Sequence, residues 1–400
     1  MSVISRARWA VSGVFWLSGM ICALWSASLP ALNERLNLGE LRVGTALLMT
    51  GIGTLVAMPL AGRLCDRWTS RRVLHVSGSA AALTLLGPAL APSYPVLLVS
   101  ALVLGAGLGS LDVAMNTHAV EVEQGYGKPI MSAFHGVWSL GGVVGSAVLA
   151  AGLYASADIG WLMASGAVVA ALLFVVPNRL LLPGRPNRAG PVQEGEAGTV
   201  RVPVVLMLGA IALSACVSEG GANDWAALHA SKVLGAGPGS ASLAYTIFAA
   251  TMTVARLLGD GLRRRLGSER TVRWSGATAV GGYGLVLLAS WLPATELSVR
   301  MICAYAGWAL AGLGLATVVP VILSAVGSAG EPGGSSGQAL SWVSTFGFAG
   351  LLSGPALIGP IAEATSLGTA MLIPAALGVV ITLAGPVAVR MSQRRFLDAP

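Results

Sequence analysis

The chain reads GAGLGSLDVAMN from residue 105 to residue 116, within a long apolar segment. Two glycines, an acid and an amide in this stretch are spaced four, three and four residues apart: Gly105, Gly109, Asp112 and Asn116. This spacing places them on one face of a helix, where glycines allow a second helix to approach closely. A carboxylate deep in an apolar membrane helix costs about 2.5 to 3.5 kcal/mol, so Asp112 requires a compensating partner or wet surroundings.

A second apolar segment follows a short polar link and opens with FHGVWS at residues 134–139. If the two segments form antiparallel helices, Asp112 lies about nine residues before the end of the first, and His135 about five residues after the start of the second. At about 1.5 Å per residue, the two positions differ in depth by about one helical turn. The acid and the imidazole can therefore share a proton or a substrate.

The composition is that of an integral membrane protein, with 55% hydrophobic residues, 10% charged residues and a mean hydropathy of +0.76. The net charge is +7, but the basic residues form short clusters between apolar runs. This pattern is typical of cytoplasmic loops and not of a nucleic-acid-binding surface. The four cysteines show no paired spacing, so we expect neither a disulfide framework nor a metal site.

Twelve apolar segments are long enough to cross a bilayer of about 30 Å. They cover residues 9–30, 41–62, 73–91, 95–119, 130–155, 158–177, 202–224, 239–261, 272–292, 299–326, 338–361 and 369–389. A polar, Pro- and Gly-rich stretch separates the two sets of six, so we predict an all-α membrane protein with two six-helix bundles, 1–177 and 202–400, and a linker at 178–201. The first segment could instead be a secretory signal peptide, but about 22 apolar residues exceed the usual signal core of about 7 to 15.

The basic residues are distributed asymmetrically when both termini are placed inside. Only four of the 24 Lys and Arg residues then face outside: Arg35, Arg42, Lys232 and Arg300. Because basic residues concentrate in cytoplasmic loops, this asymmetry predicts cytoplasmic termini. We expect a multi-pass protein of the bacterial cytoplasmic (inner) membrane.

The two halves resemble each other in short matches that keep their order along the chain, at shifts of 196, 205 and 209 residues. The matches pair Leu38-Gly39 with Leu234-Gly235, Gly107-Leu108-Gly109 with Gly312-Leu313-Gly314, and Ser132, Gly141 and Gly145 with Ser341, Gly350 and Gly354. They indicate a duplicated six-helix unit, with the solute site between the halves near mid-membrane.

Residues 62–72 read GRLCDRWTSRR and resemble the loop signature of the major facilitator superfamily: glycine, any residue, leucine, alanine, aspartate, arginine, any residue, glycine, then basic residues. The matching positions are Gly62, Leu64, Asp66 and Arg67. Thr69 and Ser70 stand where the signature has glycine and a basic residue. Residues 256–265, RLLGDGLRRR, are a looser copy. The resemblance covers essentially the whole chain and implies a transporter that works by alternating access.

The loop resemblance also implies a gating role. An acid at a helix end among arginines can form ion pairs that hold in one conformational state and break in the other. The candidate gating residues are Gly62, Asp66, Arg67, Arg71, Arg256 and Asp260. The alternative is that the arginines only fix the orientation of the chain in the membrane.

Residues 111–116, LDVAMN, look like the fourth-helix pattern of the fucose permease-like group of this superfamily, an acid followed four residues later by asparagine. In that group the acid takes part in proton coupling, a role that the match carries to Asp112. The sugar permeases of the group also have an acid on helix 1, which this chain lacks. FHG at 134–136 and EGGANDW at 219–225 are similar to uncharacterised bacterial inner-membrane members of the group.

The superfamily resemblance implies that helices 1, 4, 7 and 10 line a central cavity. The candidate proton-coupling residues are Asp112, Glu219 and His135. A carboxyl group in apolar surroundings can hold a proton and release it when the cavity opens to water. The candidate substrate-binding residues are Asn116, Trp138, Asn223, Trp25 and Trp308. The alternatives are structural hydrogen bonds for Asp112 and His135, an interfacial position for Glu219, and helix packing for the tryptophans.

No Arg or Lys is expected in mid-cavity, which disfavours strongly anionic solutes. We therefore predict a monomeric, proton-coupled secondary active transporter that moves a small neutral, sugar-like solute and needs no cofactor. A proton-driven efflux antiporter for drugs or natural products and a non-transporting membrane sensor are the alternatives. The chain has no Walker A motif and its four histidines are scattered, so we expect neither ATP-driven transport nor an enzyme.

Overall fold

The computed structural model describes residues 2–183, 202–293, 295, 297–329 and 337–393. Within these ranges the regular elements are helices and no strand occurs. Eleven helical segments of the described chain are long and apolar enough to cross a membrane. The predicted span at 272–292 is also helical but is not among the eleven, since its glycines, serines and tryptophans dilute its aliphatic residues. The all-α membrane fold is thus confirmed. Residues 184–201, most of the predicted linker, lie outside the described residues.

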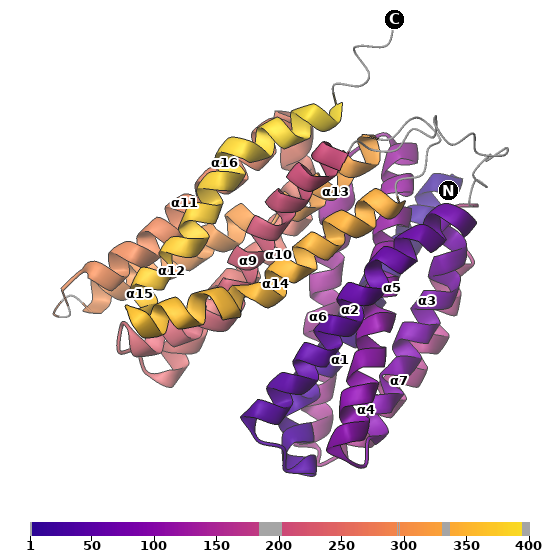
Figure 1. The fold of residues 1–400 in the computed structure, drawn as a ribbon, viewed down its shortest axis with the longest axis horizontal. Helices are drawn as coiled ribbons and strands as arrows, with labels where there is room; N and C mark the ends of the chain where they lie inside the picture. The colour runs from indigo at the N-terminus through magenta and orange to yellow at the C-terminus, as the bar shows by residue number, and fades with distance from the viewer. Residues whose placement is uncertain (1, 184–201, 294, 296, 330–336, 394–400) are drawn as a thin grey trace, which may run out of the picture. The chain divides into compact units, whose positions relative to one another are not determined.

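Except between α8 and α9 and between α13 and α14, successive helices are joined by short connections (Figure 1). They are α1 (Val3–Leu36), α2 (Glu40–Trp68), α3 (Ser70–Thr84), α4 (Leu86–Leu90), α5 (Tyr94–Tyr126), α6 (Met131–Tyr154), α7 (Ile159–Leu173), α8 (Val175–Asn178), α9 (Val202–Lys232), α10 (Pro238–Leu266), α11 (Ser268–Trp291), α12 (Leu297–Leu315), α13 (Val318–Ser328), α14 (Gly337–Ala364), α15 (Leu367–Ala370) and α16 (Leu372–Gln393). Several predicted spans, such as 299–326, consist of two helices in succession.

The chain divides into two compact units. Of the described residues, the first unit contains those in Met1–Lys128, Val137–Thr199 and Gly330–Trp342, and the second those in Pro129–Gly136, Val200–Ala329 and Val343–Pro400. The first turn of α6 therefore groups with the second unit, and the first turn of α14 with the first unit.

In the first unit α5 packs against α2, α3 and α1. Gly105 and Gly109 face α2, and a Cβ atom on either would collide with its backbone at Thr50 and Thr54. The hydroxyl group of Thr54 donates to the carbonyl oxygen of Gly105 at 3.0 Å, which ties the two helices together. The glycine face that the spacing predicts is therefore a close helix contact, as small residues permit in membranes.

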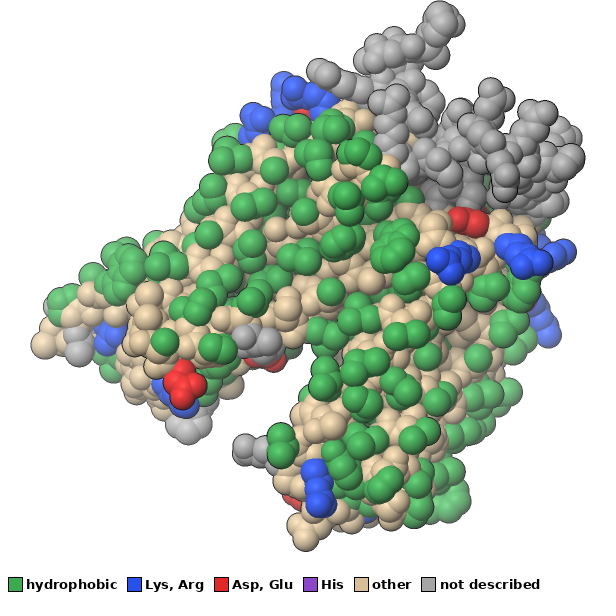
Figure 2. All heavy atoms as spheres, in the orientation of Figure 1, with side chains coloured by type: hydrophobic (Ala, Val, Ile, Leu, Met, Phe, Trp, Pro, Cys, Tyr) green, Lys and Arg blue, Asp and Glu red, His purple; other side chains and the backbone are tan. Residues whose placement is uncertain are grey.

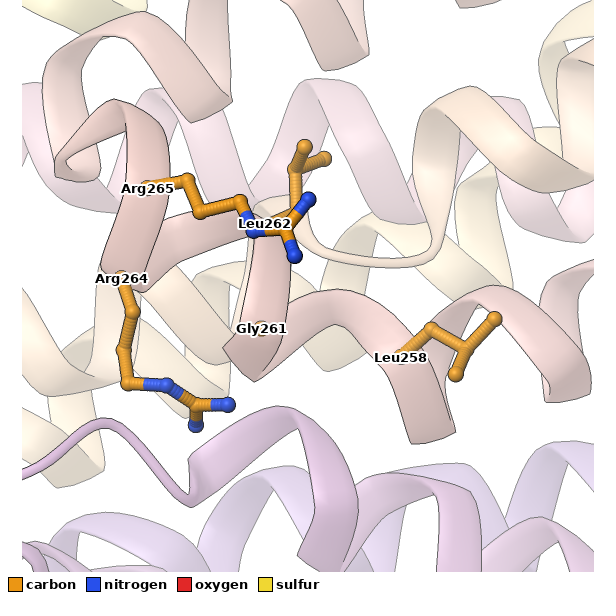
Figure 3. Close-up of a pocket in the computed structure, with 5 residues that line it drawn as sticks. All are labelled: Leu258, Gly261, Leu262, Arg264 and Arg265. Carbon is orange, nitrogen blue, oxygen red and sulfur yellow. The ribbon is translucent and has the colours of Figure 1, made fainter.

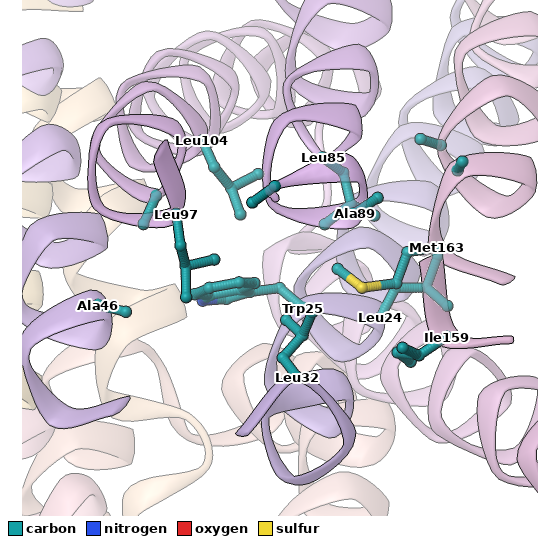
Figure 4. Close-up of a cluster of buried hydrophobic side chains, with 14 of the residues drawn as sticks. Leu24, Trp25, Leu32, Ala46, Leu85, Ala89, Leu97, Leu104, Ile159 and Met163 are labelled. Carbon is teal, nitrogen blue, oxygen red and sulfur yellow. The ribbon is translucent and has the colours of Figure 1, made fainter. Parts of the chain in front are cut away.

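A cluster of buried apolar side chains from α1, α2, α4, α5, α6 and α7 forms the core of the first unit (Figure 4). Trp25 of α1 belongs to this cluster and points toward Leu97 of α5 in the close-up. Burying apolar side chains in this way holds together helices that are distant in sequence.

In the second unit α11 packs against α12 and α16, and α9 packs against α16 and α10. Its buried side chains are mainly aliphatic and include one aromatic cluster. Trp308 of α12 is fully buried and meets the rings of three residues edge to face. These are His229, Phe248 and Tyr283, with centroid distances of 6.0, 6.4 and 5.8 Å. Such edge-to-face geometry is favoured for aromatic pairs.

The glycines of α6 and α14 make equivalent contacts, which shows the internal duplication in three dimensions. In α6 the contacts are Gly141 with Trp16 and Gly145 with Met20 of α1, and in α14 they are Gly350 with Leu213 and Gly354 with Val217 of α9. Both pairs of partners are 197 residues apart. The repeat therefore preserves which side of each helix lies against its neighbour.

One of the sequence matches between the halves is wrong by two residues. The Gly-Leu-Gly triplets at 107 and 312 predict a shift of 205 residues, whereas the contacts give 207. Gly105 and Gly312 face the second helix of their halves, α2 and α10, while Gly107 and Gly314 face the third, α3 and α11. A glycine-rich chain allows a local match out of register, and only helix contacts correct it.

Hydrophobic side chains cover much of the surface of the helices, while basic and acidic side chains gather near helix ends (Figure 2). Large side chains such as Val56, Leu172 and Leu383 are more than half exposed. An apolar surface of this extent is expected for helices that face lipid and not water.

Candidate functional site

Asp112 and Asn116 of α5 form a polar pair inside the first unit. The side-chain amide of Asn116 donates to the Asp112 carboxylate at 3.1 Å and to its backbone oxygen at 2.9 Å. Asn116 is buried, and its Oδ1 atom has no hydrogen-bond partner among the described residues. Asp112 itself is half-buried. The half-buried Asp112 carboxylate can hold a proton, whereas the Asn116 acceptor is buried and offers no surface to a solute in this structure.

Asp112 lies farther from the end of its helix than the sequence predicts. Helix α5 continues to Tyr126, so Asp112 lies 14 residues before its end, or about 21 Å along the axis. His135 lies four residues after the start of α6, or about 6 Å. The helix end on which the equal-depth prediction rests is wrong, because α5 continues through the polar residues that mark its end in the sequence. Contacts such as Arg8 with Tyr126 accompany this extension.

Glu219 of α9 and Arg256 of α10 form an ion pair inside the second unit. One guanidinium nitrogen, Nη2, lies 3.0 and 3.1 Å from the two carboxylate oxygens. The side chains are 17% and 9% exposed, so the pair is largely withdrawn from its surroundings. In apolar surroundings either charge alone would be costly, and each neutralises the other.

This pair corrects one sequence prediction. Arg256 is grouped with the loop arginines in the sequence, but in the structure it lies ten residues before the end of α10 and is buried. The partner of Arg256 is 37 residues earlier, on another helix, and no local pattern reveals such a pairing.

Other polar groups of the second unit surround the Glu219–Arg256 pair. The charge of Arg256 acts on His135, and that of Glu219 acts on Tyr245 and Tyr283. The Tyr283 hydroxyl donates to the backbone oxygen of the residue before Glu219 at 2.7 Å. Of the three predicted proton-coupling residues, Glu219 is thus paired with the guanidinium of Arg256, and His135 lies within reach of its charge.

The predicted substrate-binding residues are more dispersed. Asn223, one turn after Glu219, has an exposed side chain, and Trp138 is half-buried. Trp25 and Trp308 are buried in the cores of the first and second units, where they pack against apolar and aromatic side chains. These contacts support the packing alternative for Trp25 and Trp308, since neither offers surface to a solute in this structure.

The two candidate gating acids each accept hydrogen bonds from the first backbone N–H groups of a helix. Within the first unit, Asp66 accepts from Gly337 at 2.8 Å and from Gln338 at 2.9 Å, at the start of α14. Within the second unit, Asp260 accepts from the N–H groups at the start of α6, those of Ser132 at 3.0 Å and Ala133 at 2.8 Å. A carboxylate is favourable there because helix N-termini carry unpaired donors and partial positive charge.

Glycines allow these acids to approach the helix ends. A Cβ atom at Gly62 would collide with Ser341 of α14, and one at Gly259 would collide with Thr317 and approach Ser132 of α6. Gly62 is one of the signature positions, so its role here is close approach. The loop motif and its looser copy thus build the same feature twice.

The predicted arginine ion pairs are not part of this arrangement. The side chains of Arg67 and Arg71 have no hydrogen-bond or ion-pair partner within the described part of the chain. Arg67 is exposed and Arg71 half-exposed. Backbone donors at the helix ends, which a sequence does not display as charge, bind Asp66 and Asp260 instead.

A partly buried hydrogen-bond network near the signature loop was not predicted. The Ser70 hydroxyl donates to Glu121 Oε2 at 2.8 Å and lies 2.8 Å from His118 Nδ1, and the Leu182 N–H donates to His118 Nε2 at 3.2 Å. Because Nε2 accepts, the histidine proton resides on Nδ1 and points to Ser70. One indication of this network is visible in the sequence, because Ser70 stands where the signature has a basic residue.

Comparison with known proteins supports a common family. The model of the Major Facilitator Superfamily matches residues 11–329. An uncharacterized MFS-type transporter of Yersinia pestis is 32% identical over 356 residues, covering 89% of both chains. The membrane protein MosC of Rhizobium meliloti is 30% identical over 382 residues, covering 94% of this chain and 88% of that protein.

Solved structures show the same fold. The transporter FucP in its outward conformation superposes with a TM-score of 0.75 at 15% identity, covering 98% of this chain and 99% of that chain. The proton:xylose symporter XylE gives a TM-score of 0.73 at 15% identity, covering 96% and 95%. The family match spans most of the chain and agrees with the loop motif, the helices and the duplicated contacts. The chain therefore belongs to the Major Facilitator Superfamily and is a multi-pass membrane transporter.

Proposed function

We propose that this transporter couples proton movement to the passage of a small neutral, sugar-like solute by alternating access, with its halves 1–177 and 202–400 as the moving parts and both termini in the cytoplasm. The observation that carries the proposal is the Glu219–Arg256 pair inside the second unit. It provides an acid that can take up a proton within the membrane and a contact that changes when it does.

Protonation of Glu219 would remove one charge of a largely buried pair. Arg256 would then be left without its counter-ion in apolar surroundings, which is costly. The Nη2 contacts at 3.0 and 3.1 Å would weaken, and α9 and α10 would lose an electrostatic link. Proton binding thereby favours a different helix arrangement, which is the differential interaction that coupling requires.

Asp112 is the second protonatable group in this proposal. Its carboxylate has an amide partner and no buried cation among its described contacts, so a proton can bind without breaking an ion pair. The free Oδ1 of Asn116 supplies an acceptor beside it. In a conformation that exposes this atom, a solute hydroxyl group that donates to Asn116 would satisfy it.

Two observations support a neutral solute. The charges of Glu219 and Arg256 cancel in the paired state. In addition, the fold neighbours include a fucose:proton symporter and a proton:xylose symporter, and a D-xylose transporter of Levilactobacillus brevis is 23% identical over 174 residues. An acidic solute is the second candidate, since a carboxylate could replace Glu219 on Arg256 once Glu219 is protonated.

Gating in this proposal depends on Asp66 and Asp260. Each holds the first turn of another helix through two backbone hydrogen bonds. When the ends of these helices separate during the transport cycle, both bonds break together. The caps therefore stabilise one conformational state without a covalent or metal link.

The experiment is uptake by proteoliposomes that contain the purified protein. Labelled L-fucose, D-xylose and a small carboxylate such as lactate are tested with and without an inward proton gradient, and with a protonophore as the control. We expect accumulation of a neutral sugar only when the gradient is present. Gradient-driven accumulation of lactate alone would favour the acidic solute. If no tested solute exchanged across the liposome membrane in a counterflow assay, the sugar proposal would be contradicted.

A further inference from the structure

The last turns of α10 line a small depression in the second unit (Figure 3). Its volume is about 340 Å³, and it is lined by Leu258, Gly261, Leu262, Arg264 and Arg265. Residues 258, 261, 262 and 265 follow helical spacing and share one face of α10. In Figure 3 both arginine side chains extend from the end of α10 toward the part of the helix that carries Gly261 and Leu262.

Among the described residues, the arginines of the depression have no counter-ion. Neither Arg264 nor Arg265 has a hydrogen-bond or ion-pair partner in the portion of the chain that the structure describes. The preceding arginine is engaged differently, since Arg263 donates to Ser268 at 2.9 Å. Two guanidinium groups at one site, both unpaired, suit a single phosphate group.

The apolar side of the depression faces outward. Leu258 is 67% exposed and Leu262 is 43% exposed, although both lie on a helix that is apolar enough to cross a membrane. Gly261 leaves space at the base of the depression. A Cβ atom built there would have only Arg264 Nη2 within 4 Å, at 3.6 Å. Exposed leucines suit an acyl chain, and the arginines at the helix end suit the headgroup above it.

We propose that this depression binds an anionic phospholipid, with Arg264 and Arg265 on its phosphate group and Leu258 and Leu262 along an acyl chain. The requirement for both surfaces distinguishes the site from a soluble-phosphate site, which would not need the leucines. It also differs from general charge attraction, which any exposed arginine would provide.

The test is lipid binding to the full-length protein, purified in detergent and measured by native mass spectrometry. The probes are dioleoyl phosphatidylglycerol, dioleoyl phosphatidylcholine and inorganic phosphate. We expect phosphatidylglycerol to bind in preference to phosphatidylcholine. We also expect R264Q/R265Q to weaken its binding about tenfold or more, as the loss of two basic groups near a lipid surface predicts.

Two further variants distinguish binding in the depression from attraction to exposed positive charge. Gly261→Leu keeps both arginines and fills the base of the depression, so it should weaken phosphatidylglycerol binding by a similar factor. R270Q/R273Q removes two exposed arginines of α11 that do not line the depression, and it should change binding less than about twofold. Gel filtration and circular dichroism verify folding of each variant.

Three results would overturn the proposal. They are equal weakening in R270Q/R273Q, equal binding of the two lipids, and full displacement of phosphatidylglycerol by millimolar inorganic phosphate. Unchanged binding in Gly261→Leu would also contradict it, because the lipid would then not occupy the depression.

Discussion

Asp112 in the first unit and Glu219 in the second are both acids within membrane helices, but they are satisfied in different ways. Asp112 receives a hydrogen bond from a neutral amide one turn away on its own helix. Glu219 is paired with a guanidinium group 37 residues away on a neighbouring helix. The first partnership follows from helical spacing and is visible in the sequence, whereas the second depends on how two helices pack. The unit with the ion pair should also be the more sensitive to losing a partner.

Arg256→Met should have the largest effect on stability. It leaves Glu219 largely buried without a counter-ion, so we expect a loss of about 3 kcal/mol in the free energy of unfolding. Thermal unfolding in detergent measures this change. E219Q/R256M should recover more than half of the loss, since no isolated charge remains. Arg390→Met, which breaks the exposed pair with Glu269, is the control and should cost less than about 1 kcal/mol. Similar losses of stability in Arg256→Met and Arg390→Met would refute a special role for the burial of the Glu219–Arg256 pair.

Asp112→Asn and Glu219→Gln test whether both acids carry protons. In proteoliposomes we expect each to reduce pH-driven accumulation about 100-fold while solute exchange stays partly active, because exchange needs no net proton movement. The measurement is uptake with and without a proton gradient, with Glu269→Gln as the matched acid control. Unchanged pH dependence in Asp112→Asn would confine proton coupling to the second unit and make the two acids functionally unequal.

Gly141→Ala tests a close helix contact within the first unit that has an equivalent, at Gly350, within the second unit. The added Cβ atom would collide with the backbone of Trp16, so we expect a loss of about 2 kcal/mol. Gly142→Ala is the matched control one residue away, where the nearest atom, the oxygen of Gly19, would lie at 3.8 Å. Thermal unfolding of both variants gives the comparison. If the duplication preserves energetics as well as contacts, Gly350→Ala should behave as Gly141→Ala does.

Asp66→Asn and Asp260→Asn probe the two helix caps. Each change removes the charge that favours the helix N-terminus but keeps one acceptor, so we expect a loss of about 1 kcal/mol at each site. Hydrogen exchange at Gly337 and Gln338, and at Ser132 and Ala133, should increase only for the helix whose cap is changed. Exchange that rises at neither helix would argue against capping by these carboxylates.

Thr69→Gly should have the smallest effect, and it should be stabilising. Thr69 adopts a φ of 130°, a backbone conformation that disfavours a β-branched residue and that the loop signature assigns to glycine. Its hydroxyl accepts a weak cap bond from Arg72 at 3.3 Å, and the loss of this bond offsets part of the gain. We expect a net gain of about 0.5 kcal/mol in thermal unfolding. Thr45→Gly, within α2, should instead lose about 1 kcal/mol.

The candidate site was readable from the sequence only in part. Asp112 and Asn116 could be paired because residues four apart on a helix are neighbours. Arg256 could not be paired with Glu219, and its place among other arginines in the motif copy suggested a loop. The distance of Asp112 from the end of its helix was misjudged because the polar residues before Tyr126 hide the continuation of α5. Packing was the expected role of most of the tryptophans, but the sequence did not show which of them pack, and the burial of Trp25 and Trp308 identifies these two.

The sequence alone determined the membrane class, the helices, the duplication and the family, because hydropathy, glycine spacing and the motif at 62–72 act over short stretches of chain. Tertiary structure decided which charges meet. It pairs Arg256 with Glu219 and places Asp66 and Asp260 at the starts of α14 and α6. It also shows that the Gly-Leu-Gly match between the halves has a shift of 207 residues and not 205. The physical reason is that electrostatic and backbone partners across helices are set by packing, which residue order does not specify.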